Sequence, residues 1–236
     1  DALREYAALG YRKFEVFTGW AGSAFDVATG DPAEYLAAGR RHGMTFTSMH
    51  LPATEEDRPA SVALAVKGAE AAAALGVKVV LYKGKTRAAY INNAKAFLDG
   101  IEGLAVIPVL QNHVGTPITT LEDFRAIIDG INDTRMKTLL EVGMFHTIGV
   151  TWDQGCNLLD DSIALVHIKD QIGEQRVPFG EGEVDLEGLF RRLETDGYDG
   201  EIVVEMEVCR DDTKRTLELL GAAREHIAGV LEEIHK

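Results

Sequence analysis

Short apolar runs rich in β-branched residues alternate along the chain with longer amphipathic stretches rich in Ala, Leu and Glu. A short apolar run predicts a buried strand, and apolar residues at helical spacing predict a helix that packs on a sheet. The pattern predicts seven strands, near residues 13–18, 45–50, 78–82, 105–111, 137–142, 163–168 and 202–207. It predicts eight helices, near residues 2–9, 32–42, 60–74, 87–98, 121–130, 152–159, 186–195 and 213–234. Strands and helices that alternate in this way build a parallel sheet.

The predicted helix ends carry recognisable capping residues. Asp31 followed by Pro32 is an N-cap with proline in the first helical position, and Gly43 ends the same helix. Thr120 and Asp123 resemble a capping box. These residues support the predicted boundaries between strands and helices.

Seven strands and eight helices, with strand starts about thirty residues apart, predict a (β/α)₈ TIM barrel whose first strand is missing before Ala2. A doubly wound open sheet is the alternative. Pro108 conflicts with its predicted strand because proline cannot donate to a ladder. No composition shift or Pro/Gly/Ser-rich linker divides residues 1–236, so we expect a single domain.

Composition and charge narrow the classes of partner. The chain of 236 residues is 46% hydrophobic, enough for a large core. Its formal net charge of −14 disfavours nucleic acid and anionic membranes, which need clustered Lys and Arg. No apolar run approaches the ~20 residues that span a bilayer. Cys156 and Cys209 form no zinc motif or disulfide framework, so a reduced cytoplasmic setting is expected.

Polar residues gather where the predicted strands end, which in a TIM barrel is where active sites lie. Residues two apart on a strand share one face, which places Glu205 with Glu207, and His167 with Lys169. The strand-end residues are His50, Lys83, Lys85, Gln111, His113, Glu141, His146, His167, Lys169, Glu205 and Glu207.

Carboxylates and imidazoles that converge after apolar strands suit a divalent metal ion. A ligand set of Gln111, Glu141, His167 and Glu205 carries two negative charges and balances one such ion. The competing interpretations are a surface carboxylate at Glu141 and a core histidine at His167. A buried acid at Glu205, between two apolar residues, needs a partner.

The segment ALVHIKDQIGEQRVPFGEGEVDLEGLFRRLETDGYDGEIVVEMEV contains a strand that ends in His-x-Lys-Asp, then a Gly-x-Gly-x-x-Asp loop and a strand that ends in Glu. With these motifs, with QNHVGT and with the opening DALREYAALGYRKFEVF, the chain resembles the xylose-isomerase-like sugar phosphate isomerase/epimerase superfamily. The resemblance covers essentially the whole chain. It implies a TIM barrel and a metal-dependent enzyme, but isomerases, epimerases, dehydratases and apurinic-site endonucleases share it.

The resemblance places the metal ligands on Gln111, Glu141, His167 and Glu205, and two of these depart from the common pattern. Gln111 stands where many relatives have Glu, and Glu141 stands where they commonly have Asp. Met144 occupies the place of a substrate-contacting histidine, for which His146 is the candidate substitute. The implied ion is Mn, Mg, Zn or Co.

In epimerases that this chain resembles, the metal polarises a carbonyl and two carboxylates act as base and acid on the neighbouring carbon. Gln111 cannot take a proton, so symmetric two-carboxylate epimerisation is the reaction it weakens most. Chemistry through Glu205 as the single base survives, either as isomerisation or as elimination of water. Lys169 is expected to stabilise an enediolate or, alternatively, to pair with a nearby acid.

Several further residues are candidates for substrate contact. His50 and His113 follow strands, and each is either a substrate contact or a turn or packing residue. Lys83 can receive a substrate anion or lie in solvent, and Trp20 can pack on the apolar side of a sugar. The glycines at 180 and 182 lack the third glycine of a dinucleotide fingerprint, which excludes a nicotinamide site.

The expected function is a metal-dependent isomerase or epimerase of a small polyhydroxylated substrate, with no nucleic-acid or membrane partner. The alternatives are a related dehydratase of a cyclic polyol and a sugar-binding barrel that has lost one acid/base residue at Gln111. A nuclease of the same superfamily would need more metal ligands and a basic groove. A homodimer and a homotetramer both remain open.

Overall fold

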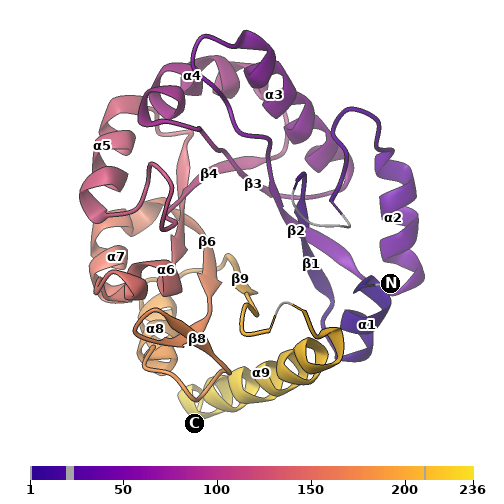
Figure 1. Ribbon diagram of the computed structural model, residues 1–236, viewed down its shortest axis with the longest axis vertical. Helices are drawn as coiled ribbons and strands as arrows, with labels where there is room; N and C mark the ends of the chain where they lie inside the picture. Colours follow the sequence, from indigo (N-terminus) through magenta and orange to yellow (C-terminus); the bar gives the residue numbers. More distant parts are fainter. Residues whose placement is uncertain (1, 20–23, 210) are drawn as a thin grey trace. The chain divides into compact units, whose positions relative to one another are not determined.

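The computed structural model describes residues 2–19, 24–209 and 211–236 (Figure 1). The chain divides into two compact units, residues 1–139 and 140–236, and the boundary falls within one strand. The single-domain organisation therefore stays a prediction.

Five parallel strands form the sheet of the first unit, hydrogen-bonded in chain order. They are β1 (Lys13–Phe17), β2 (Thr45–His50), β3 (Val79–Leu81), β4 (Ile107–Gln111) and β5 (Lys137–Glu141), the last of which continues into the second unit. The helices are α1 (Ala2–Ala8), α2 (Pro32–Arg41), α3 (Pro59–Ala74), α4 (Arg87–Gly100) and α5 (Leu121–Ile131). In Figure 1, α3, α4 and α5 lie along one side of these strands.

Apolar burial and helix caps explain these elements. All three residues of β3 are buried, as a continuous apolar run predicts for a strand covered on both faces. The carboxylate of Asp31 accepts a hydrogen bond from the backbone of Ala33 at 2.8 Å, with Pro32 in the first helical turn. Thr120 and Asp123 form a reciprocal capping box at the start of α5. The predicted caps are confirmed.

Pro108 lies within β4, opposite Val80 of β3, without breaking the ladder. On the β3 side the hydrogen bonds come from its neighbours: Ile107 N donates to Lys78 O at 2.7 Å, and Val109 O accepts from Tyr82 N at 2.9 Å. Alternation turns the Pro108 nitrogen toward β5, which begins only at Lys137, paired with Val109. The conflict seen in the sequence is therefore resolved by where β5 starts.

The second unit contains the parallel pair β6 (Ile163–Ile168) and β9 (Glu201–Val204) and an antiparallel hairpin. The hairpin is β7 (Asp170–Ile172) and β8 (Gln175–Val177). The helices are α6 (Val142–Thr147), α7 (Trp152–Leu159), the 3₁₀ helix η1 (Asp160–Ser162), α8 (Leu186–Thr195) and α9 (Thr213–Ile234).

The structure confirms the seven predicted parallel strands within the described residues, and it adds α6 and the β7–β8 hairpin. Both additions are too short to show a hydrophobic period. β9 ends at Val204, so Glu205 and Glu207 follow the strand rather than end it. The backbone of Glu205 still donates to Ile168 O at 2.9 Å, which keeps it in line with β6.

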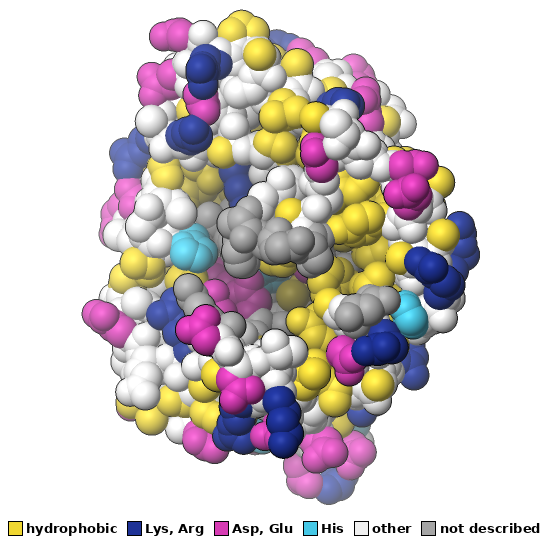
Figure 2. Space-filling model, turned by 45° about the vertical axis from the view of Figure 1, so that its right-hand side comes forward, with side chains coloured by type: hydrophobic (Ala, Val, Ile, Leu, Met, Phe, Trp, Pro, Cys, Tyr) yellow, Lys and Arg dark blue, Asp and Glu magenta, His cyan; other side chains and the backbone are white. Residues whose placement is uncertain are grey.

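None of the helices within the described ranges is both long enough and apolar enough to cross a bilayer. On the face shown in Figure 2, Lys and Arg side chains are interspersed with Asp and Glu side chains.

Candidate active site

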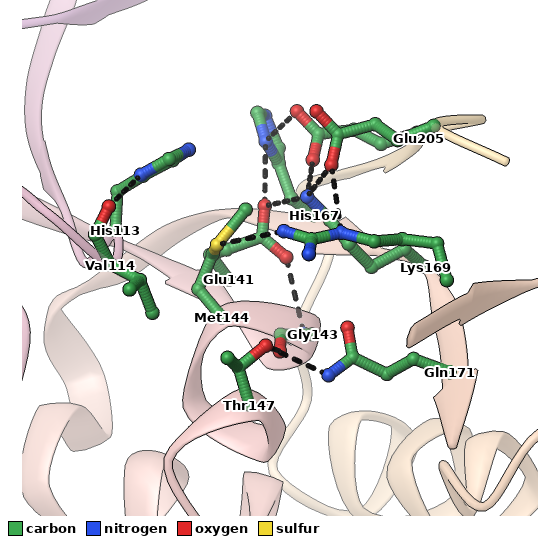
Figure 3. A network of polar contacts seen from close by, with 12 residues as sticks. His113, Val114, Glu141, Gly143, Met144, Thr147, His167, Lys169, Gln171 and Glu205 are labelled. Atoms are coloured by element: carbon green, nitrogen blue, oxygen red, sulfur yellow. Dashed lines mark hydrogen bonds and ion pairs between the residues drawn. The ribbon is translucent and has the colours of Figure 1, made fainter. Parts of the chain in front are cut away.

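Five charged or ionisable residues of the second unit meet in one network, which we call the acid–base cluster: Glu141, His167, Lys169, Glu205 and Glu207. Glu141 ends β5, His167 lies in β6, Lys169 follows β6, and the two other glutamates follow β9. Figure 3 shows Glu141, His167, Lys169 and Glu205 turned toward one another. The side chains of Glu141, His167 and Lys169 are almost fully buried, and those of Glu205 and Glu207 are 19% and 27% exposed.

The ammonium of Lys169 is the centre of the cluster. Its Nζ lies 2.5 Å from Glu205 Oε2, 3.1 Å from Glu207 Oε2 and 3.4 Å from Glu141 Oε2. The imidazole of His167 is close to two of the same carboxylates, with Nδ1 3.1 Å from Glu205 Oε1 and 3.6 Å from Glu141 Oε2. Three carboxylates are thus gathered around one ammonium and one imidazole, which offset their mutual repulsion.

Backbone geometry fixes Glu141 within the cluster. Its Oε1 accepts a hydrogen bond from the Gly143 backbone at 3.1 Å, so the carboxylate also caps α6. A Cβ atom on Gly143 would overlap the aliphatic chain of Lys169, so only glycine allows this helix to pack so closely. The short helix missed by the sequence pattern is therefore what orients the carboxylate.

The β7–β8 hairpin reaches the cluster through Arg176. Its Nε lies 3.4 Å from Glu207 Oε2, and its guanidinium is 3.7 Å from the sulfur of Met144. Glu207 consequently lies between the ammonium of Lys169 and the guanidinium of Arg176.

Burial and neighbouring charge shift the acid dissociation constants in the cluster. Burial, followed by the negative charge of Glu205, raises the pKa of Glu141 to about 7. Burial also opposes ionisation of Glu205, but His167 and Lys169 outweigh it and hold the pKa of Glu205 well below its usual value. Burial would lower the pKa of Lys169, and the surrounding carboxylates raise it instead. The cluster thus separates a carboxylate that titrates near neutral pH, Glu141, from one that is ionised there, Glu205.

Asp170, next to the cluster in sequence, organises the loop after β8. Its buried carboxylate accepts backbone hydrogen bonds from Gly180 at 2.8 Å, Gly182 at 3.0 Å and Gln171 at 2.9 Å. A Cβ atom on Gly182 would overlap this carboxylate. The Gly-x-Gly spacing is therefore explained by a backbone that wraps around an aspartate.

A second network lies in the first unit, and we call it the β1–β3 cluster: Glu15, Ser48, His50 and Lys83. His50 Nε2 lies 2.8 Å from Glu15 Oε1, and His50 Nδ1 lies 2.6 Å from Lys83 Nζ. The hydroxyl of Ser48 donates to Glu15 Oε2. Glu15, Ser48 and His50 are buried.

The other predicted site residues fall outside these two networks. Gln111 is buried at the end of β4, and His113 Nδ1 lies 2.8 Å from Val114 O. His146 on α6 has its Nε2 3.4 Å from Glu183 Oε2. Trp20 lies outside the described residues. The predicted roles of all these residues as ligands, substrate contacts or catalysts stay predictions.

Sequence reasoning missed Glu15 and Arg176. Glu15 carried the same signal that singled out Glu205, an acid between apolar residues of a strand. Arg176 carried none, because only the β7–β8 hairpin brings it to Glu207.

The family model of the xylose isomerase-like TIM barrel matches residues 3–227. The chain belongs to this family. The predicted TIM-barrel fold is thereby confirmed, and the seven parallel strands agree with it.

Solved structures share the fold of this xylose isomerase-like barrel. 3-keto-D-glucoside 4-epimerase, YcjR, from E. coli is 18% identical over 98% of this chain and 92% of its own, with a TM-score of 0.76. IOLI protein with a binding zinc atom is 18% identical over 98% and 92% of the chains, with a TM-score of 0.75. A xylose isomerase-like TIM barrel protein from Mycobacterium smegmatis in complex with magnesium is 17% identical over 98% and 87%, with a TM-score of 0.77. No curated protein matches the chain.

Proposed function

We propose that this xylose isomerase-like barrel is a divalent-metal-dependent isomerase or epimerase of a small polyhydroxylated substrate. The observation that carries the proposal is the acid–base cluster, in which carboxylates, an imidazole and an ammonium meet where β5, β6 and β9 end. An epimerase, a zinc-bound protein and a magnesium-bound protein share the fold, which supports this class of chemistry. The two free cysteines fit a cytoplasmic setting.

The donor set of the cluster fits a divalent cation. His167 offers an imidazole nitrogen, Nδ1, which lies 3.6 Å from Glu141 Oε2 and 3.1 Å from Glu205 Oε1. Nitrogen and oxygen donors with two negative charges suit Zn²⁺, Mn²⁺ or Mg²⁺. We propose that these three residues hold the ion. When bound, such an ion polarises a substrate carbonyl.

The chain's own residues supply the proton transfer. Glu205 is the proposed base, because its partly exposed carboxylate is kept ionised by His167 and Lys169. It takes the proton from the carbon next to the substrate carbonyl. Lys169 stays protonated among three carboxylates and stabilises negative charge that develops on the substrate oxygen. Gln111 takes no part in proton transfer, since an amide has no useful pKa.

Metal analysis and thermal unfolding test the metal dependence. We expect the purified protein to contain a stoichiometric divalent metal, and an ion at 100 times its Kd to stabilise the EDTA-treated protein by about 2.7 kcal/mol, or about 5–10 °C in Tm. Glu205→Gln should abolish most of this shift, whereas Glu187→Gln, whose side chain is 54% exposed on α8, should leave it unchanged. A protein without bound metal and without a metal-dependent shift would refute the proposal.

The buried amide of Gln111 favours a second candidate, a barrel that binds sugars without converting them. That candidate predicts sugar binding that survives Glu205→Gln and no exchange of substrate carbon-bound hydrogen with D₂O. The isomerase or epimerase predicts exchange in the wild type and its loss in Glu205→Gln. Elimination of water from a cyclic polyol would instead appear as an unsaturated or deoxygenated product in the same NMR spectra.

A further inference from the structure

Both glutamates that we propose as metal ligands are already paired with a cation of the chain itself. The ammonium of Lys169 lies 2.5 Å from Glu205 Oε2 and 3.4 Å from Glu141 Oε2. The lysine side chain is only 2% exposed, so solvent and salt screen these contacts little. A divalent ion that binds the same two carboxylates therefore meets the repulsion of this ammonium.

The aliphatic chain of Lys169 is packed tightly and cannot swing out to solvent. It lies so close to Gly143 that a Cβ atom there would overlap the Cγ and Cδ atoms of the lysine. A buried ammonium without a partner is costly. When another cation binds Glu141 and Glu205, the ammonium consequently needs a different carboxylate inside the cluster.

Glu207 is the carboxylate that can take over the ammonium. Its Oε2 already accepts a hydrogen bond from Lys169 Nζ at 3.1 Å. Arg176 Nε, 3.4 Å from the same oxygen, ties Glu207 to the β7–β8 hairpin. Asp170, next to Lys169 in sequence, is not an alternative partner, because its carboxylate accepts backbone hydrogen bonds from the loop after β8. Glu207 is also outside the set of residues that we propose as metal ligands.

We propose that Lys169 is an internal counterion that competes with the divalent ion for Glu141 and Glu205, and that Glu207 is the positioning residue for its ammonium when the ion is bound. The inference rests on the proposed function, in which the two competed glutamates hold the ion. Without the ion, the ammonium offsets the repulsion between the carboxylates. With the ion, its charge is balanced by Glu207, and the ammonium stays in the cluster. The competition sets how tightly the protein binds the ion.

Two variants should change the metal affinity in opposite directions. Competition is reciprocal, so the ion gains in affinity what it no longer loses to the ammonium. Lys169→Met removes the competitor and should tighten binding of the ion. Glu207→Gln leaves the ammonium with only the two carboxylates that the ion needs, and it should weaken binding.

Titration with Mn²⁺ measures these changes. The wild type and both variants are treated with EDTA, freed of chelator and titrated at pH 8, and the electron paramagnetic resonance of free Mn²⁺ gives Kd. We expect Lys169→Met to bind Mn²⁺ about 10-fold or more tightly than the wild type, and Glu207→Gln about 5-fold or more weakly. Arg191→Met is the control for net charge. It removes a cation that pairs with Glu187 on α8, and its Kd should stay within about 2-fold of the wild type.

The double variant Lys169→Met/Glu207→Gln separates contact with the ammonium from charge acting at a distance. If Glu207 acts by holding the ammonium, Glu207→Gln should have little effect on Kd once Lys169 has been replaced. If Glu207 acts only through its own negative charge, Glu207→Gln weakens binding equally in both backgrounds. Equal effects would overturn the role of Glu207, and Lys169→Met that binds Mn²⁺ no more tightly than the wild type would overturn the competition.

A second variant keeps the test decisive if Lys169→Met does not fold without the ion. Lys169→Gln removes the charge but leaves an amide that can donate to the carboxylates, and it should also bind Mn²⁺ more tightly than the wild type. If neither variant of Lys169 gains affinity while the wild type binds the ion, the competition alone is refuted. A wild type that binds none of Mn²⁺, Zn²⁺ and Mg²⁺ instead refutes the proposed metal site, and the competition falls with it.

Discussion

Replacing Lys169 by methionine removes the positive charge that three carboxylates share while keeping a side chain of similar length. The ammonium is 2% exposed and lies within 3.4 Å of Glu141, Glu205 and Glu207. Removing one partner of a buried ion pair costs about 3–5 kcal/mol, because the remaining charge is left buried without compensation. We expect Lys169→Met to lower the free energy of unfolding by this amount at pH 8.

The loss of unfolding free energy in Lys169→Met should depend on pH, and the raised pKa of Glu141 gives the direction of that dependence. Its pKa is about 7 in the folded protein against an ordinary value of 4.5, so the folded state binds its proton more tightly than the unfolded state does. Stability from this group is therefore present below pH 4.5 and is lost as the pH rises through 7. Without Lys169 the pKa of Glu141 rises further, and each additional unit adds about 1.4 kcal/mol to the cost above that pKa. The destabilisation at pH 8 should accordingly exceed that at pH 5.

Urea unfolding of the EDTA-treated protein at both pH values measures these differences. Lys85→Met is the matched control. The side chain of Lys85 is 62% exposed, and its ammonium pairs with Glu55 at the surface. It should cost about 0–1 kcal/mol at either pH. Equal costs for the two variants, or a cost of Lys169→Met that is larger at pH 5, would refute the assignment of Lys169 as the charge that holds the cluster together.

Three further outcomes are expected. Burial raises the pKa of Cys156 to about 11, so iodoacetamide should label the half-buried Cys209 first and Cys156 only on unfolding, as mass spectrometry will show. Gly143→Ala should cost about 1–3 kcal/mol in urea unfolding because its Cβ overlaps the buried lysine chain, whereas Gly229→Ala, with open space in α9, should stabilise by about 0.5–1 kcal/mol. Asp170→Ala should release the loop after β8 and so give faster amide hydrogen exchange at residues 180–184. Helix α5 should exchange as before. Unchanged exchange at residues 180–184 would show that the carboxylate does not hold the loop.

The candidate site was predictable where it depended on local periodicity. His167 with Lys169, and Glu205 with Glu207, share faces because residues two apart on a strand point the same way, and each pair enters the acid–base cluster. The position of Arg176 was not predictable, because a hairpin of two three-residue strands has no hydrophobic period. The sequence also did not distinguish Lys83 from Lys85. They lie in the same loop, but the ammonium of Lys83 contacts the imidazole of His50, whereas that of Lys85 pairs with Glu55 at the surface.

By itself, the sequence determined the alternation of strands and helices, the TIM-barrel family and the acids, imidazoles and lysine at the strand ends, because these follow from the period of apolar residues and from local motifs. Only the tertiary structure decided the partners: Lys169 with three glutamates, and His50 with Glu15 and Lys83. These contacts join residues more than 25 positions apart, across whole strand–helix units. These contacts depend on the register between strands and on which side chains share a face of the sheet. A pattern of hydrophobic positions specifies which face of one strand is buried, but it does not specify which residue lies opposite on the neighbouring strand.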